Sequence, residues 1–113
     1  MPRSSHGQRA LRGSAPVFAA LGDETRLAIV ARLSTGGPRS ISGLTQGSAV
    51  TRQAITKHLH VLAGAGLVRG VRHGRERIWE LDSRRLDEAQ RYLAEISTHW
   101  DVALESLRKF VED

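Results

Sequence analysis

Apolar residues recur along this chain with three different periodicities, and each periodicity predicts a different kind of element. Over residues 24–34 and 51–64 they return every three or four positions, which is the spacing of one helix face. Between residues 67 and 81, two short strand-like runs flank a turn that contains Gly74, which is typical of a β-hairpin. From 83 to 112 the apolar residues follow a seven-residue repeat, which predicts one long helix. The pattern therefore predicts a mainly α-helical chain with a small β-hairpin.

The helices that precede the hairpin are delimited by residues that cap or break helices. Residues 15–21 are apolar enough for a short first helix, and Asp23 is a good N-cap for the second. The sequence of residues 35–38, Thr-Gly-Gly-Pro, ends that second helix. Ser40 and Thr51 then cap the third and fourth helices. We expect four helices of short or medium length before the hairpin.

The residues expected to face the core lie at helical spacing on the second and fourth helices. They are Leu27, Val30, Ala31 and Leu33 on the second, and Ala54, Ile55, Leu59 and Leu62 on the fourth. In the hairpin, Ile78 and Trp79 are adjacent and point to opposite faces of the strand. We expect Trp79 on the half-exposed side, or packed against the last helix.

The terminal helix, residues 83–112, carries an apolar stripe that runs for nearly four heptads. Its members are Leu86, Ala89, Leu93, Ile96, Trp100, Ala103, Leu107 and Phe110. A chain of this length has few other elements that would cover so long a stripe. We therefore expect the same helix of a second subunit to bury it across a two-fold axis, which makes these eight residues the predicted dimer interface. The alternative is an amphipathic helix that lies on its own domain.

Positive charge is concentrated on the fourth helix and the hairpin. The chain of 113 residues has 17 Lys and Arg against 12 Asp and Glu, a net charge of +5. Residues 51–81 hold six basic and two acidic residues, whereas residues 82–113 hold five basic and eight acidic residues. A helix that fits a DNA groove, followed at once by a cationic hairpin, indicates a winged helix-turn-helix. Double-stranded DNA is therefore the expected partner.

The candidate DNA-binding residues have side chains that recognise bases or phosphates. Arg52 or Lys57 would donate to guanine O6 and N7, and Gln53 would pair with adenine. Thr56 lies one turn beyond Arg52 on the same face, and Arg75 at the hairpin tip would enter a narrow minor groove. The full candidate set is Thr51, Arg52, Gln53, Thr56, Lys57, His60, Arg72, Arg75 and Arg77. The alternatives are a solvated helix face and an ordinary charged hairpin.

Three segments carry a likeness to a known family. The opening motif of the ArsR/SmtB-like winged-helix repressors resembles residues 21–33, which read Leu21-Gly-Asp-Glu-Thr-Arg-Leu-Ala-Ile-Val-Ala-Arg-Leu33. The family's helix ending in Ala-Gly-Leu-Val resembles residues 51–68, and its wing resembles Gly74-Arg75 with the strand that follows. The likeness covers about residues 15–112. It implies a homodimeric repressor that places two reading helices in successive major grooves of a pseudo-palindromic operator. It also implies release of the promoter, often the protein's own, when an effector binds.

The chain departs from the metal sensors of that family. It has no cysteine, which excludes thiolate metal sites, cysteine nucleophiles and disulfides. The sensors' terminal-helix ligands begin with Asp-x-His, but here Asp87 is followed by Ala89 in the position of the His. The later ligand positions of that register hold Trp100 and Ala103. The chain resembles instead a Cys-free branch with Trp-Asp on the terminal helix, so we expect no metal and no cofactor, and a small-molecule effector that the chain does not identify.

The sequence contains no recognisable catalytic motif. No Ser/His/Asp arrangement has a recognisable local context, and no Gly-rich phosphate loop is present. Asp87 and Glu88 are adjacent on a helix, so their carboxylates diverge. We expect a transcriptional regulator and not an enzyme. The alternative function is a winged-helix module for protein–protein contact without specific DNA binding.

The expected organisation is one domain with an N-terminal extension. Residues 1–13 are polar and basic, which predicts a flexible arm, and residues 14–113 form the DNA-binding domain with residues 83–112 as its dimerisation helix. No apolar run reaches the roughly 20 residues that span a bilayer. The basic N-terminus lacks the apolar core of a signal peptide. We therefore expect a cytoplasmic protein without a membrane partner.

Overall fold

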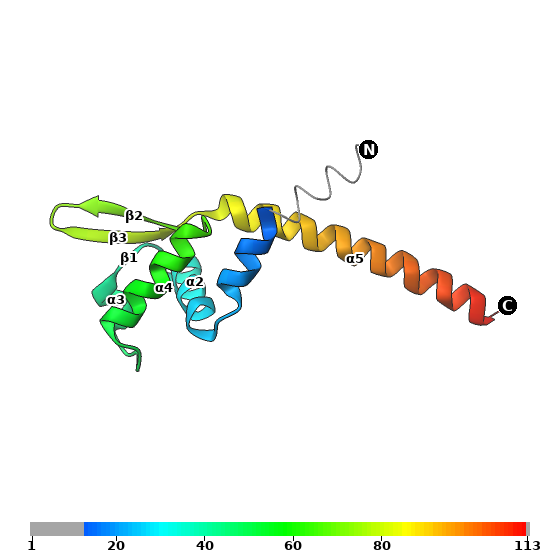
Figure 1. Ribbon diagram of the computed structural model, residues 1–113, viewed down its shortest axis with the longest axis horizontal. Helices are drawn as coiled ribbons and strands as arrows, with labels where there is room; N and C mark the ends of the chain where they lie inside the picture. The colour runs from blue at the N-terminus through cyan, green and yellow to red at the C-terminus, as the bar shows by residue number, and fades with distance from the viewer. Residues whose placement is uncertain (1–12, 113) are drawn as a thin grey trace.

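The computed structural model describes residues 13–112, and the arm predicted for residues 1–13 lies outside this range except for Gly13. Residues 13–21 are helical, and they are followed by α2 (Glu24–Gly36), β1 (Arg39–Ser40), α3 (Ile41–Thr45), α4 (Arg52–Gly64), β2 (Val68–His73), β3 (Glu76–Leu81) and α5 (Ser83–Glu112). In Figure 1, α2, α3, α4 and the sheet form one body, and α5 extends away from it as a rod. The molecule measures 66 × 32 × 20 Å. The mainly helical fold with a hairpin and a long terminal helix is confirmed.

Side-chain oxygens at the predicted N-caps satisfy free backbone N–H groups at the first turns of α2, α3 and α4. The bonds run from Arg26 N to Asp23 Oδ1 at 3.0 Å, from Gly43 N to Ser40 Oγ at 3.1 Å and from Ala54 N to Thr51 Oγ1 at 3.1 Å. These N–H groups have no partner inside their own helices, so a short polar side chain before each helix stabilises it. All three predicted caps are confirmed.

The sheet has one strand more than the predicted hairpin. Its order is β1-β3-β2 and all pairs are antiparallel, with Val68 opposite Leu81 and His73 opposite Glu76 in the hairpin. The additional strand β1 pairs Arg39 with Trp79 of β3. Two residues are too few to show alternating hydrophobicity, which is why the sequence pattern did not reveal this strand. As a consequence β3 is the central strand of the sheet.

The core is formed by apolar side chains from the helix at residues 13–21, from α2, α3, α4, β2, β3 and α5, and from Leu67 between α4 and β2. Its buried members are Val17, Ala20, Ile29, Leu33, Leu44, Ile55, Leu59, Leu62, Leu67, Val68, Trp79 and Ala89. On α2 the prediction was wrong for Leu27, which is 51% exposed, and for Ala31, which is exposed. The buried positions are Ile29 and Leu33, one helical turn apart. Apolar residues on α2 surround the helix, so their spacing alone did not identify the buried face.

Trp79 is the second correction, because it is only 3% exposed whereas Ile78 is half-buried. The expectation that Trp79 lies on the half-exposed side was therefore wrong. On one side the ring of His60 from α4 lies 6.2 Å away between centroids, and the guanidinium of Arg77 lies 5.8 Å from the indole. The physical reason is tertiary packing: α2 and α3 contact β3, and Trp79 belongs to the buried core cluster.

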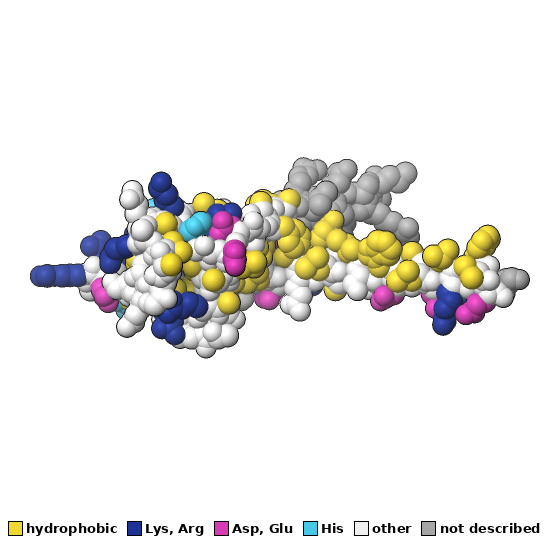
Figure 2. All heavy atoms as spheres, turned by 90° about the horizontal axis from the view of Figure 1, so that it is seen from below, with side chains coloured by type: hydrophobic (Ala, Val, Ile, Leu, Met, Phe, Trp, Pro, Cys, Tyr) yellow, Lys and Arg dark blue, Asp and Glu magenta, His cyan; other side chains and the backbone are white. Residues whose placement is uncertain are grey.

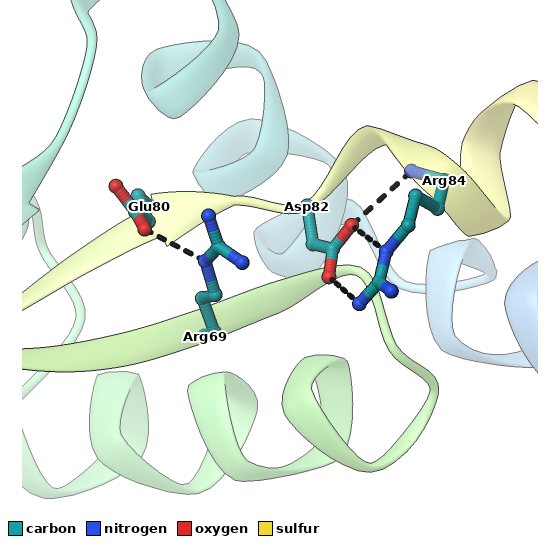
Figure 3. A network of polar contacts seen from close by, with 4 residues as sticks. All are labelled: Arg69, Glu80, Asp82 and Arg84. Atoms are coloured by element: carbon teal, nitrogen blue, oxygen red, sulfur yellow. Dashed lines mark hydrogen bonds and ion pairs between the residues drawn. The ribbon is translucent and has the colours of Figure 1, made fainter.

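The first turns of α5 are attached to the body, and the rest of the helix is not. Leu86 and Ala89 pack against the core, and the rings of Phe18 and Tyr92 lie 6.5 Å apart. Asp82 directly precedes this helix, and its carboxylate accepts from Arg84 N at 3.2 Å. Figure 3 shows this cap beside the cross-strand pair of Arg69 and Glu80. From residue 97 to 112 every residue of α5 is exposed.

Candidate nucleic-acid interface

Helix α4 presents the predicted reading residues on its outer side. Arg52, Gln53, Lys57 and His60 are exposed, whereas Ile55, Leu59 and Leu62 anchor the opposite side in the core. The half-buried Thr56 donates its hydroxyl to the carbonyl of Arg52 at 2.9 Å. The hydroxyl oxygen keeps lone pairs for a base or phosphate donor. The structure thus brings the candidate residues of α4 together on one accessible face.

Two arginines of α2 link this helix to α3 and α4. Arg32 donates to the carbonyls of Leu44 and Gly43 at 2.9 and 3.1 Å, which satisfies free acceptors at the end of α3. Arg26 donates to the carbonyl of Ala20 at 2.6 Å and reaches His58 of α4. These bonds hold α3 and α4 at a set orientation to α2. Charge-assisted hydrogen bonds of this kind are stronger than neutral ones.

His58 has a structural role in this arrangement. Its Nδ1 lies 3.3 Å from Arg26 Nη1 and 4.0 Å from an oxygen of Asp23. The backbone N–H of Arg26 lowers the pKa of Asp23, and the charges of Arg26 and His58 contribute in the same direction. The half-buried side chain therefore joins α4 to the start of α2.

The wing is a tight hairpin whose tip carries an arginine. Gly74 has a φ of +61°, and Arg75 beside it has a negative φ. A positive φ at the first central position alone is the pattern of a type II′ turn, which suits two-residue hairpin loops. Arg72 and Arg77 face each other across the strands and both are exposed. Among the described residues these arginines form no ion pair, whereas Arg69 pairs with a carboxylate of β3 at 2.7 Å.

A shallow hollow of about 150 Å³ lies where α3, α4 and the wing meet. Its lining consists of Ser40, Ile41, Ser42, Arg52, Arg75, Glu76 and Arg77. Arg52 Nη1 donates to Ser42 Oγ at 3.0 Å, which links the start of α4 to α3. Sequence reasoning did not single out Ser42, because nothing in the local pattern indicates that this hydroxyl meets an arginine ten residues later.

Along α5 the predicted interface residues fall into two groups. Leu86 and Ala89 are covered by the protein's own core, whereas Ile96 is half-buried and Ala103 exposed. The large apolar side chains farther out have exposed fractions of 51% for Leu93, 60% for Trp100, 59% for Leu107 and 82% for Phe110. Figure 2 shows hydrophobic side chains in a row along this rod. Most of the Lys and Arg side chains visible on this face lie at the other end of the molecule, and a smaller basic group lies near the free end of the rod.

Comparison with known proteins agrees with this architecture. Residues 21–71 match the model of a helix-turn-helix domain family. YuzN of Bacillus subtilis (strain 168), an uncharacterized HTH-type transcriptional regulator, is 43% identical over 68 residues, which cover 55% of this chain and 74% of YuzN. An ArsR-like transcriptional regulator from Rhodococcus sp. RHA1 is 38% identical with a TM-score of 0.76, over 88% of this chain and 92% of that one. The crystal structure of another ArsR family transcriptional regulator is 31% identical with a TM-score of 0.69, over 83% and 93% of the two chains.

The chain belongs to the ArsR-like family of helix-turn-helix transcriptional regulators. The resemblance stated from the sequence is thereby confirmed, and so is the expectation of a DNA-binding regulator. Transcriptional regulators of this family are not enzymes, which agrees with the lack of recognisable catalytic motifs. The match includes α2, α3 and α4, the elements that carry the helix-turn-helix.

Two further structural observations apply to this ArsR-like regulator. No three potential metal ligands come together anywhere in residues 13–112. Within the same range, no helix combines the length and the apolar character needed to cross a membrane.

Proposed function

We propose that this ArsR-like regulator is a homodimeric repressor that binds a pseudo-palindromic operator and leaves it when an effector binds. The observation that carries the proposal is the uncovered apolar stripe of α5 on a chain whose other end presents a cationic reading face. Each feature needs a second component: the stripe needs apolar cover, and the reading face needs a polyanion. A symmetric dimer on DNA supplies both.

The dimer forms along α5, beginning at Leu93. Leu86 and Ala89 are already in contact with their own core, so the partner covers the stripe from Leu93 to Phe110. Burial of apolar surface contributes about 25 cal/mol per Å², and an isolated helix of such composition gains little stability from propensity alone. A two-fold axis through the paired helices places the same surface on both subunits. It also sets two copies of α4 at fixed separation.

On DNA, α4 enters the major groove and the wing lies over the neighbouring backbone. Gln53 and Thr56 are near the start of α4, where the reading helix of such domains meets base edges. Lys57, His60 and the wing arginines 72 and 75 supply cations toward phosphates. A bound dimer on a promoter blocks access of the transcription machinery, which is the physical basis of repression. Effector binding then shifts the protein toward a state with lower DNA affinity.

The first experiment is fluorescence anisotropy on the DNA upstream of the protein's own gene, against a scrambled duplex, over a range of salt. Three or four phosphate contacts per subunit give a log–log slope of roughly −5 to −7 for the dimer. We expect tight, selective binding with that slope. Weak binding that is equal on both duplexes contradicts operator recognition at this promoter. Either the operator then lies elsewhere, or the winged helix binds a protein partner, and a genome-wide DNA selection separates these two cases.

The dimer is tested with Leu93→Glu and Ile96→Glu, which place a charge in the stripe. Both variants should sediment as monomers and bind the operator at least tenfold more weakly, because an unpaired buried carboxylate is strongly unfavourable. Thr98→Glu is the control, since Thr98 is exposed on α5 and its position lies outside the heptad stripe. Dimeric mass for both stripe variants would refute pairing through α5.

A further inference from the structure

We propose that the hollow between α3, α4 and the wing binds one backbone phosphate of DNA, and that Arg52 is a phosphate anchor and not a base reader. The proposal rests on DNA binding as the proposed function and assigns a role within it. The wing and the start of α4 would then grip the same phosphate, which sets the register of the reading helix.

Three arginines from two separate elements line this hollow. Arg52 comes from the first turn of α4, and Arg75 and Arg77 come from the wing. The carboxylate of Glu76 is also present, so the lining keeps an excess of two positive charges. A surface hollow with this excess attracts a phosphate group, whose oxygens accept from guanidinium N–H groups.

The dimensions also suit a phosphate. The hollow has a volume of about 150 Å³. A hollow of this size has room for a small anionic group such as phosphate. A nucleobase is larger, and it remains in the stack when DNA is read from the groove.

The hydrogen bond between Arg52 and Ser42 argues against base reading by Arg52. Its Nη1 donates to Ser42 Oγ at 3.0 Å, which directs the guanidinium toward α3 and the wing. This bond uses one of the five N–H donors of the guanidinium and holds the group over the hollow, where the other four can meet phosphate oxygens. For a phosphate in the hollow, the bond is helpful. Ser42 accepts from Arg52 and keeps its own hydroxyl proton to donate.

Gln53 is the matched control on the same turn of α4. Its side chain is exposed and does not line the hollow. If Gln53 reads a base, its loss changes the ranking of DNA sequences. If Arg52 binds phosphate, its loss weakens all sequences alike. The two adjacent residues therefore have opposite signatures.

The test measures operator binding and binding to single-base-pair variants of the operator, at several salt concentrations, for wild type, Arg52→Ala, Ser42→Ala and Gln53→Ala. Arg52→Ala should lower affinity by the same factor on every duplex and make the salt slope of the dimer shallower by about 1.8, which is 0.9 for each phosphate lost. Ser42→Ala should act in the same direction with a smaller factor. Gln53→Ala should compress the differences between duplexes and leave the slope unchanged. A loss of base preference in Arg52→Ala at an unchanged slope would overturn the phosphate assignment and leave the proposed function intact.

A second measurement does not depend on DNA. Titration of the free protein with inorganic phosphate, followed by NMR, should shift the Arg52 Nε–H and Ser42 amide signals at millimolar concentrations, and Arg52→Ala should abolish the Ser42 response. Unshifted signals in the wild type would count against the hollow as a phosphate site. A positive titration in a protein that fails to select its operator would support the hollow and contradict the proposed function. Thermal melting controls for folding, because Arg52 is exposed and its removal leaves the core unchanged.

Discussion

At the scale of single residues, Gly66 determines how the chain leaves α4. It has a φ of +79°, a region that side chains with a Cβ rarely adopt. A Cβ built at this position would also lie 2.8 Å from Cγ of Arg85. The next residue, Leu67, is fully buried and leads into β2. The left-handed glycine therefore reverses the chain between the reading helix and the wing.

We expect Gly66→Ala to destabilise the protein by about 1–2 kcal/mol, because the left-handed conformation is unfavourable for alanine. Gly64→Ala is the matched control two residues earlier: Gly64 is helical, and nothing lies within 4 Å of its built Cβ. That variant should be more stable by about 0.5–1 kcal/mol. Urea unfolding measures both, and equal stability of the two variants would contradict the conformational argument.

Local signals in the sequence were reliable at this scale, and distant contacts were not. The N-caps Asp23, Ser40 and Thr51 were predicted because a cap depends only on residues within one turn. The burial of Trp79 and the bond from Arg52 to Ser42 depend on elements that are brought together by folding. Neither has a local signature, so the first was mispredicted and the second was missed.

At the scale of elements, α5 is a single helix with two different environments. Its start is fixed by Asp82, whose carboxylate accepts from the guanidinium of Arg84 at 3.1 and 2.8 Å and from the Arg84 backbone N–H. The side-chain hydrogen bonds from Arg84, followed by the backbone bond, lower the pKa of Asp82 to about 2 from an ordinary value of 3.8. The charged form of Asp82 is thus the one that supports the first turn.

The lowered pKa of Asp82 predicts a pH dependence of stability. A carboxyl group with a lower pKa in the folded state stabilises the protein fully above its unfolded pKa, and this contribution is lost as pH falls from about 4 toward 2. Asp82→Asn should therefore melt at a lower temperature than wild type at pH 6. The difference should shrink between pH 4 and pH 2. A difference that stays constant over this range would show that the charge of Asp82 does not contribute.

The periodicity of α5 made this element the easiest to predict, since one heptad pattern extends over its whole length. The two-residue strand β1 was the hardest for the opposite reason. Helix α2 lies between these extremes: its existence was predicted, but the choice between Leu27 and Ile29 as a buried residue depends on what packs against it. The candidate reading face on α4 was predictable because its apolar and polar sides separate clearly.

At the scale of the whole molecule, the unit formed by α4 and the wing differs from α5 in net charge, and most of its apolar side chains are buried or half-buried whereas those of the outer part of α5 are exposed. The segment 51–81 has an excess of basic residues and the segment 82–113 has an excess of acidic ones. DNA is therefore attracted to α4 and the wing and repelled by the rod. On the proposed dimer, this distribution orients the protein with both reading helices toward the duplex.

The uncovered stripe predicts that thermal stability depends on protein concentration. Association stabilises a folded state by mass action, so the melting temperature of the proposed dimer should rise by several degrees between 1 and 100 µM chain. The control is Leu93→Glu, whose melting temperature should not change over the same interval. A melting temperature of the wild-type protein that is independent of concentration would contradict coupling between pairing and folding.

The partial attachment of α5 has a consequence for gene control. On the proposed dimer, a second chain covers the outer part of this helix, so the number of dimers rises as the square of the chain concentration while monomers predominate. Operator occupancy then has a threshold that a monomeric repressor lacks. If the regulated promoter is its own, synthesis would stop sharply once that threshold is passed and resume when cell growth dilutes the protein below it. The affinity of the proposed dimer, which depends on how much of α5 the second chain covers, would thus set the protein concentration at which the promoter is repressed.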